Sequence, residues 1–144
     1  RRLKALKRLA GETQDGFGAT MLENASFRQR LAEIEIELKA LEYSELRTLA
    51  ALSVGKAPGP ESSILKIVGT ELAQKMDEMF VELAGYNCLP FVPEQFESGF
   101  DGDAIGPGDS ASAALTYFNN RKLSIFGGSN EIQRNIITKA VLGL

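Results

Sequence analysis

The chain has 144 residues and a formal net charge of −3, with 44% hydrophobic and 24% charged residues. A chain of this length is expected to form one domain with its own core. Because the net charge is negative and most Lys and Arg residues are scattered, no nucleic-acid-binding face is expected.

Histidine is absent, and Cys88 is the only cysteine. These counts exclude a structural zinc site, a Ser-His or Cys-His nucleophile and an intrachain disulfide within this chain. We therefore expect no metal ligands, a reducing cytoplasmic location and a Cys88 that is a small, partly buried side chain rather than a reactive thiol. No apolar run reaches the roughly 18–20 residues of a membrane span, and no signal peptide opens the chain.

The chain opens with arginine inside a helical pattern, so we interpret it as a fragment of a longer protein. Residues 1–10 are predicted to end a helix, with Leu6 and Leu9 at helical spacing and Gly11 as its stop. The following residues to Glu23 are predicted to be a loop. Basic residues cluster in the opening helix, either as a solvated face or as a contact with a partner: Arg1, Arg2, Lys4, Lys7 and Arg8.

A long helix is predicted from the N-cap Asn24 to about Ser53. An apolar stripe suited to a helix bundle runs along it: Phe27, Leu31, Ile34, Leu38 and Leu41. Acidic residues flank the stripe on both sides: Glu33, Glu35, Glu37, Glu42 and Glu45. We expect them to be solvated and to form pairs such as Glu35 with Lys39, without a convergent acid/base pair.

A third helix is predicted from Glu61 to about Gly85, with Met76 and Met79 as core residues rather than a ligand platform. Its apolar face comprises Leu65, Val68, Leu72, Met76, Met79 and Leu83. The segment from Tyr86 to Gly108 is irregular and acidic and carries three aromatic rings: Phe91, Phe96 and Phe100. We expect these rings to anchor the segment on the bundle, the alternative being that they line part of a substrate channel.

A fourth helix is predicted from a cap at Asp109 to about Lys122, and a fifth from about Ser129. In the fifth, the residues expected to face inward are Ile132, Ile136 and Val141. No strand is predicted. The predicted fold is all-α, an up-and-down four-helix bundle with a short C-terminal helix.

The segment Ser124-Ile-Phe-Gly-Gly-Ser-Asn-Glu-Ile-Gln-Arg-Asn-Ile-Ile137 lies before and within this last helix. Two glycines allow a tight turn, Ser129 can cap the helix, and Glu131 lies in its first turn. The free N–H groups suit an anion, a phosphate or a polar cofactor group, although a turn and a cap alone also explain the pattern.

This segment, with Lys139-Ala-Val-Leu-Gly-Leu144, resembles the C-terminal signature of the acyl-CoA dehydrogenase family. The helical pattern from Asn24 onward resembles that family's C-terminal helical domain. The resemblance implies that residues 1–144 form this single domain, and that the family's N-terminal helical domain and middle β-domain are absent. It also implies a parent enzyme that uses FAD to convert an acyl-CoA thioester to the 2,3-enoyl-CoA, and a fragment that is inactive alone.

The resemblance places three pieces of the family's cofactor site on this chain. The first comprises Phe126, Gly128, Ser129 and Glu131. The second comprises Gly85 and Asn87, beside Tyr86 and Cys88 where the family has glycines. The third, an arginine for the flavin pyrophosphate, has no clean match here. Lys7 or Arg8 are weak substitutes.

The family's usual catalytic glutamate position is occupied by Gly127, so the resemblance implies no catalytic residue in this chain. The base could lie near or before Arg1, come from another subunit of a heteromeric enzyme, or be lost together with the redox chemistry. The alternative function is a non-catalytic helical subunit or scaffolding domain of a heteromeric complex. The expected partners are an acyl-CoA, an electron-transfer acceptor and other subunits in a homo- or hetero-oligomer, a dimer or a tetramer. The apolar tail 141–144 joins that interface or packs on its own bundle.

Overall fold

The computed structural model of the chain describes residues 1–103, 105–106 and 110–144. Five α-helices are present: α1 (Arg2–Glu12), α2 (Ala25–Ser53), α3 (Glu61–Ala84), α4 (Ser110–Asn120) and α5 (Asn130–Leu142). Three short 3₁₀ helices connect them: η1 (Gly85–Cys88), η2 (Pro93–Phe96) and η3 (Arg121–Ser124). The described residues contain no strand, only an isolated bridge between Gln14 and Thr20. The all-α prediction is confirmed, whereas the cap predicted at Asp109 lies outside the described residues.

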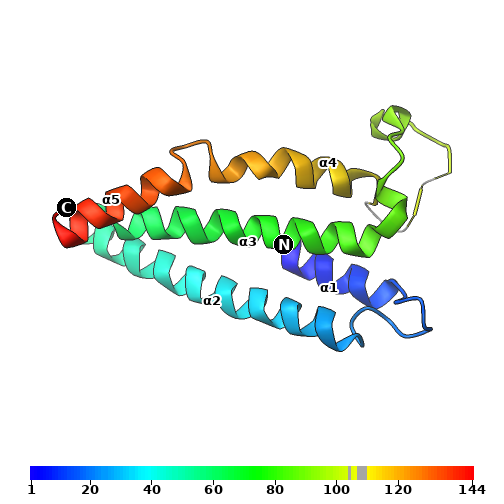
Figure 1. Cartoon of the computed structure of the whole chain (residues 1–144), viewed down its shortest axis with the longest axis horizontal. Helices are drawn as coiled ribbons and strands as arrows, with labels where there is room; N and C mark the ends of the chain where they lie inside the picture. The colour runs from blue at the N-terminus through cyan, green and yellow to red at the C-terminus, as the bar shows by residue number, and fades with distance from the viewer. Residues whose placement is uncertain (104, 107–109) are drawn as a thin grey trace.

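Helix α3 is the central element of the bundle (Figure 1). Helix α2 runs along one side of it, α1 covers part of its length, and α4 and α5 lie on the other side. Helices α4 and α5 follow one another along α3, joined by η3 and a turn. The fourth helical layer is therefore broken in two, and the break lies alongside α3 rather than at the end of the bundle.

Predicted apolar stripes form the core where α1, α2 and α3 meet. The side chain of Asn24 accepts a hydrogen bond from the Phe27 N–H at 3.0 Å and starts α2, as predicted. The buried core cluster comprises Leu6, Leu9, Ala10, Phe27, Leu31, Ile34, Leu72, Met76, Met79 and Leu83. Leu38, Leu41 and Val68 pack against it. Met76 and Met79 are core residues, as predicted. Cys88 is a small buried side chain, also as predicted.

A buried carboxylate joins three of the helices. Asp77 of α3 is 1% exposed and accepts hydrogen bonds from Arg2 of α1 and, at 2.8 Å, from the Asn120 side-chain amide of α4. The Arg2 guanidinium also lies over the Phe80 ring, 5.6 Å from its centroid. Helices α1 and α4, which are separated by about two-thirds of the chain, are thus both held to α3 by one polar cluster.

Two local predictions near the start of the chain are wrong. Helix α1 passes through Gly11 and ends at Glu12, with Thr13 as its C-cap. A Cβ at Gly11 would lie 3.3 Å from Leu22 Cδ1, so this glycine gives close packing inside the helix rather than a stop. Lys39 pairs with Glu42 at 2.7 Å and not with Glu35, whose carboxylate accepts from Lys7 at 2.6 Å. Spacing along a single helix does not reveal a partner on another helix, such as Lys7 of α1 for Glu35 of α2.

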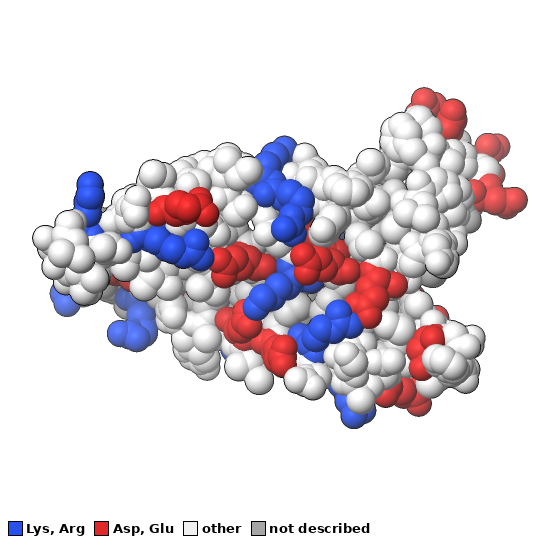
Figure 2. All heavy atoms as spheres, viewed as in Figure 1, with Lys and Arg blue, Asp and Glu red and all other residues white. Residues whose placement is uncertain are grey.

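The aromatic rings of residues 86–103 do not anchor that segment to the bundle. Phe91 is 68%, Phe96 50% and Phe100 39% exposed. Residues 89–103, which follow η1, project away from the helices (Figure 1). Acidic side chains lie on this projection, whereas on the bundle face in view Lys and Arg alternate with Asp and Glu (Figure 2).

The apolar residues predicted to face inward on α5 face outward instead. Ile132 is 51%, Ile136 45% and Val141 63% exposed, while Asn130 is buried. Helix α5 packs mainly against α3, so only one of its faces is covered. The tail is exposed too, with Leu142 at 66% and Leu144 at 79%, which contradicts packing on its own bundle.

Candidate functional site

The turn between η3 and α5 carries the predicted motif. Gly127 and Gly128 both have left-handed backbone, with φ of 70° and 84°, a conformation that glycine adopts without the strain of a side chain. A Cβ built on Gly127 would meet nothing within 4 Å, whereas one on Gly128 would lie 2.7 Å from Gln133 Nε2. The open side of the turn is therefore at Gly127, and Gly128 is covered by a flexible side chain of this protein.

Ser129 starts α5 as predicted. Its hydroxyl accepts from the Ile132 N–H at 3.4 Å, a long cap hydrogen bond. Glu131 follows in the first turn and is exposed. A hydrogen bond with Ser129, and secondarily one with the backbone N–H of Glu131 itself, lowers the pKa of the Glu131 carboxyl. Glu131 is thus an ionised acceptor at the helix N-terminus, not a base with a raised pKa.

Replacing Glu131 with glutamine is expected to destabilise the protein slightly at pH 7. Because the pKa of Glu131 is lowered in the folded state, its contribution is full above the ordinary glutamate pKa of about 4.3. The contribution disappears as the pH falls through the lowered value. Urea unfolding of the wild type and of Glu131→Gln at pH 7 and at pH 3 measures it, with the exposed Glu45→Gln as the matched control. A gap that persists unchanged at pH 3 contradicts the assignment.

A polar stripe of α3 holds the turn in place. Asn130 is 5% exposed, and its side-chain oxygen accepts from Lys66 Nζ at 2.8 Å and from Thr70 Oγ1 at 3.4 Å. Gln74 Nε2 donates to the main-chain oxygens of Asn120 and Arg121 at 3.2 and 3.3 Å. These contacts fix both sides of the turn relative to α3.

The sequence analysis missed this supporting stripe, although the signal was present. Lys66, Thr70 and Gln74 recur every four residues, which places them on one face of a helix. Polar residues at that spacing indicated the face that receives α4, η3 and α5.

The other predicted cofactor residues lie elsewhere along α3. Gly85, with φ of 53°, ends α3, and nothing lies within 4 Å of a Cβ built on it. Asn87 is exposed, and its side chain lies against Gly106, where a Cβ would come within 2.4 Å. Lys66 and Gln74, which hold the turn, precede Gly85 by at least eleven residues of helix, or about 16 Å. Within a single chain, Gly85 and Asn87 therefore do not lie next to the turn that carries Gly127 and Ser129.

Lys7 and Arg8 are held by neighbouring carboxylates. Lys7 Nζ lies 2.6 Å from Glu35, and Arg8 lies 2.8 Å from Glu12 one turn later on the same helix. Within the described residues, neither cation is directed at the Gly127 turn.

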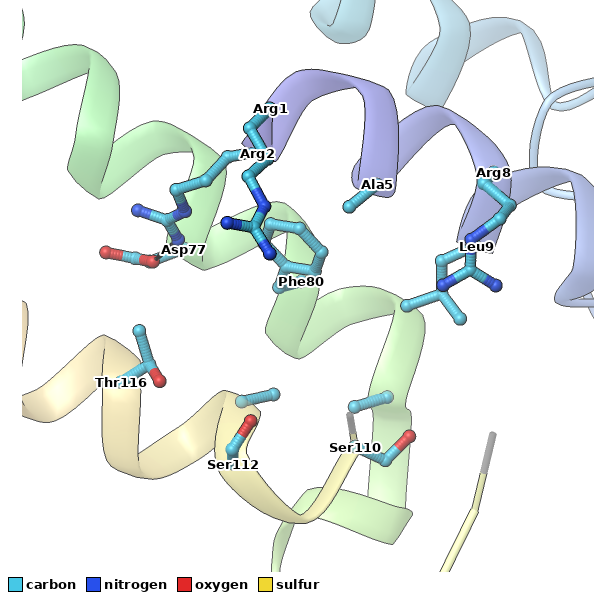
Figure 3. Close-up of a pocket in the computed structure, with 12 residues that line it drawn as sticks. Arg1, Arg2, Ala5, Arg8, Leu9, Asp77, Phe80, Ser110, Ser112 and Thr116 are labelled. Atoms are coloured by element: carbon cyan, nitrogen blue, oxygen red, sulfur yellow. Dashed lines mark hydrogen bonds and ion pairs between the residues drawn. The ribbon is translucent and has the colours of Figure 1, made fainter. Parts of the chain in front are cut away.

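A cavity of about 260 Å³ lies between α1, α3 and α4, and none of its lining residues belongs to the turn (Figure 3). Its walls combine Leu9 and Phe80 with Arg2 and Asp77, the ion pair described above. Elsewhere in the described chain, no group of three or more Cys, Asp or Glu side chains is arranged to hold a metal ion. No described helix is both long and apolar enough to cross a membrane.

Comparison with known proteins adds the family. The profile described as "Acyl-CoA dehydrogenase, C-terminal domain" matches residues 3–142, nearly the whole chain. The chain belongs to the acyl-CoA dehydrogenase family. Its all-α bundle is the fold of that family's C-terminal domain. A search of curated proteins found no match.

Two solved structures share this fold. The ChsE4-ChsE5 complex from Mycobacterium tuberculosis aligns with 99% of this chain at 23% identity and a TM-score of 0.71. The electron transferring flavoprotein of Acidaminococcus fermentans aligns with 98% at 16% identity and a TM-score of 0.71. The chain spans about a third of each of those chains, 34% and 32%.

Acyl-CoA dehydrogenases bind FAD, and the turn fits part of such a group. Gly127 leaves an open approach to the backbone, and Ser129 and Glu131 offer hydrogen-bonding oxygens within three positions. Phe126 adds an exposed ring at 55%. The fit is that of one edge of a ligand, since Gly85 and Asn87 lie far along α3.

Proposed function

We propose that this chain is the C-terminal domain of an FAD-dependent acyl-CoA dehydrogenase and contributes to flavin binding and oligomerisation. The observation that carries the proposal is the turn itself: an open glycine at Gly127 followed by Ser129 and Glu131, braced from α3, in a chain of this family. The family's N-terminal helical domain and middle β-domain would supply the rest of the flavin and thioester pocket.

Bound FAD would supply the acceptor for the hydride that leaves the acyl β-carbon. The part played by this chain is binding. Ser129 and Glu131 would hydrogen-bond a polar part of the dinucleotide, and Gly127 would let the backbone approach it. Gly85 and Asn87, at the end of α3, would contact the flavin of a neighbouring subunit.

The α-proton would have to be removed by a group outside this turn, because Gly127 has no side chain. Glu131 is hydrogen-bonded to Ser129 with a lowered pKa, and Glu71 is paired with Arg134 at 3.1 Å. We therefore propose that the base lies near or before Arg1, or comes from a second subunit of a heteromeric enzyme. Residues 1–144 alone are expected to form no enoyl-CoA.

The test is the flavin content of the full-length protein, purified alone and with candidate partner subunits. Stoichiometric FAD is expected in at least one pairing. Ser129→Ala is expected to weaken flavin binding about tenfold, the worth of one hydrogen bond. Ser62→Ala, at an exposed serine of α3, is the control. Wild-type flavin affinity in Ser129→Ala, measured on a variant that folds normally, would sink the assignment of this turn.

A helical scaffolding domain is the second candidate. It is favoured by Gly127 itself and by Tyr86 and Cys88, which stand where the family has glycines. Absence of flavin from the full-length protein in every pairing would favour the scaffold.

A further inference from the structure

The cavity between α1, α3 and α4 is larger than a packing defect. Its volume is about 260 Å³, whereas protein interiors hold few voids larger than one water molecule. This volume is close to the ~300 Å³ of the smallest ligand pockets. Helices α1 and α4 form opposite walls, and α3 lies between them (Figure 3). The space is therefore large enough for a small organic molecule.

Small side chains keep the cavity open. Ala5 of α1, Ala84 of α3 and Ala113 of α4 line it, and each of these side chains ends at Cβ. Ala84 and Ala113 are 2% and 8% exposed. The rest of the apolar lining is Leu9, which is 5% exposed, and the Phe80 ring. A ligand in this space would therefore place a hydrocarbon group against buried carbon atoms.

The charged side chains of the cavity favour an anion. Three of them are arginines of α1, whereas Asp77 is the only carboxylate among the described residues that line it. Asp77 is paired with Arg2. Arg8 is paired with Glu12, which does not line the cavity. Within the described chain Arg1 has no ion pair, so its guanidinium can pair with the anionic group of a ligand.

Hydroxyl groups on the opposite wall add donors. Ser110, Ser112 and Thr116 of α4 line the cavity. Ser110 and Ser112 have interactions of their own, so we assign the Thr116 hydroxyl to the ligand. Thr116 lies toward the end of the cavity that carries Asp77, and Leu9 lies toward the other end (Figure 3). The cavity therefore has a polar end and an apolar end.

We propose that this cavity binds a small organic anion, a carboxylate carried on a short hydrocarbon or aromatic group. The carboxylate accepts hydrogen bonds from Arg1 and Thr116, and the apolar group lies against Phe80 and Ala113. Inorganic phosphate has the charge but no apolar surface to remove from water, so it does not suit this lining. The inference is independent of the flavin proposal, because no lining residue belongs to the Gly127 turn.

Three probes of nearly equal size and different charge test the ligand class on the intact polypeptide: benzoate, benzamide and benzamidine. Calorimetric titration with benzoate at pH 7 and low salt is expected to give a dissociation constant of about 1 mM, ordinary for a ligand of about nine non-hydrogen atoms. Neutral benzamide is expected to bind about tenfold more weakly, because hydrogen bonds to a charged group are stronger. Cationic benzamidine and inorganic phosphate are expected not to bind.

Two pairs of variants locate the bound benzoate. Ala5→Leu fills the cavity and is expected to abolish binding without lowering the melting temperature, whereas Ala40→Leu, on an exposed position of α2, is the control. Arg1→Gln is expected to weaken binding about tenfold, the worth of one charge-assisted hydrogen bond. Lys4→Gln removes the same charge from an exposed position of α1 outside the lining, and should leave the affinity unchanged.

Three results would overturn the proposal. Equal affinity for benzoate and benzamide would mean that the cavity does not select an anion. Benzoate binding that persists in a folded Ala5→Leu variant would place the ligand at another site of the polypeptide, the flavin site included. No heat of binding at about tenfold the expected dissociation constant would mean that the cavity holds no such ligand. None of these results changes the flavin content of the protein, so the proposed function is tested separately.

Discussion

Replacing Arg2 with alanine is expected to destabilise the bundle by about 3 kcal/mol, toward the low end of the cost of breaking a buried ion pair. The cost arises at Asp77, which is 1% exposed and would lose its guanidinium partner, while the Asn120 side-chain amide still donates to it at 2.8 Å. Arg2 is 40% exposed, so water reaches one side of the pair and limits the loss. The contact of Arg2 with the Phe80 ring is lost as well.

Urea unfolding measures this cost, and two variants separate charge burial from simple loss of packing. Arg8→Ala removes an exposed pair on the same helix and should change the free energy of unfolding by less than about 1 kcal/mol. The double variant Arg2→Met/Asp77→Leu removes both charges and should recover most of the loss. If the double variant is no more stable than Arg2→Ala, the uncompensated charge is not the cause.

Replacing Phe27 with alanine is expected to cost about 3–5 kcal/mol. Phe27 is fully buried in the first turns of α2, within the cluster that joins α1, α2 and α3. The loss combines the transfer free energy that burial of the ring contributes with the cost of the cavity that its removal leaves in a core able to relax only partly. It would take away a large share of the 5–15 kcal/mol typical of a whole domain.

Thermal unfolding followed by circular dichroism measures this loss as a fall in melting temperature of about 10 °C or more. Phe17→Ala is the matched control, because that ring is 95% exposed in the loop between α1 and α2. Its melting temperature should stay close to that of the wild type. Equal effects of the two substitutions would mean that the core is not organised around Phe27.

The helices were predictable because their apolar residues recur at helical spacing and their ends carry clear signals. Asn24 and Ser129 are N-caps in the structure, as their position before apolar runs indicates. Periodicity identifies an apolar face but not what covers it. Ile132 and Ile136 therefore form a stripe that α3 does not cover, and the prediction that they face inward failed.

The candidate site was predictable only in its local part. The Gly127–Ser129 turn follows from residue types whose backbone and capping preferences are strong. Its bracing by Lys66 and Gln74 depends on a break in the fourth helical layer, which no local pattern specifies. The distance between Gly85 and the Gly127–Ser129 turn likewise depends on where along α3 each of them lies. A match to a sequence motif gives no information about that distance.

The break between α4 and α5 has a consequence for the energetics of the C-terminal segment. Because α5 packs mainly against α3, its detachment would break the contacts between these two helices and leave the packing among the other helices intact. Local detachment of α5 is therefore expected to cost less free energy than global unfolding, with Gly127 and Gly128 as the hinge. A ligand that binds at this hinge would stabilise the docked position of α5 and raise the free energy needed to detach it.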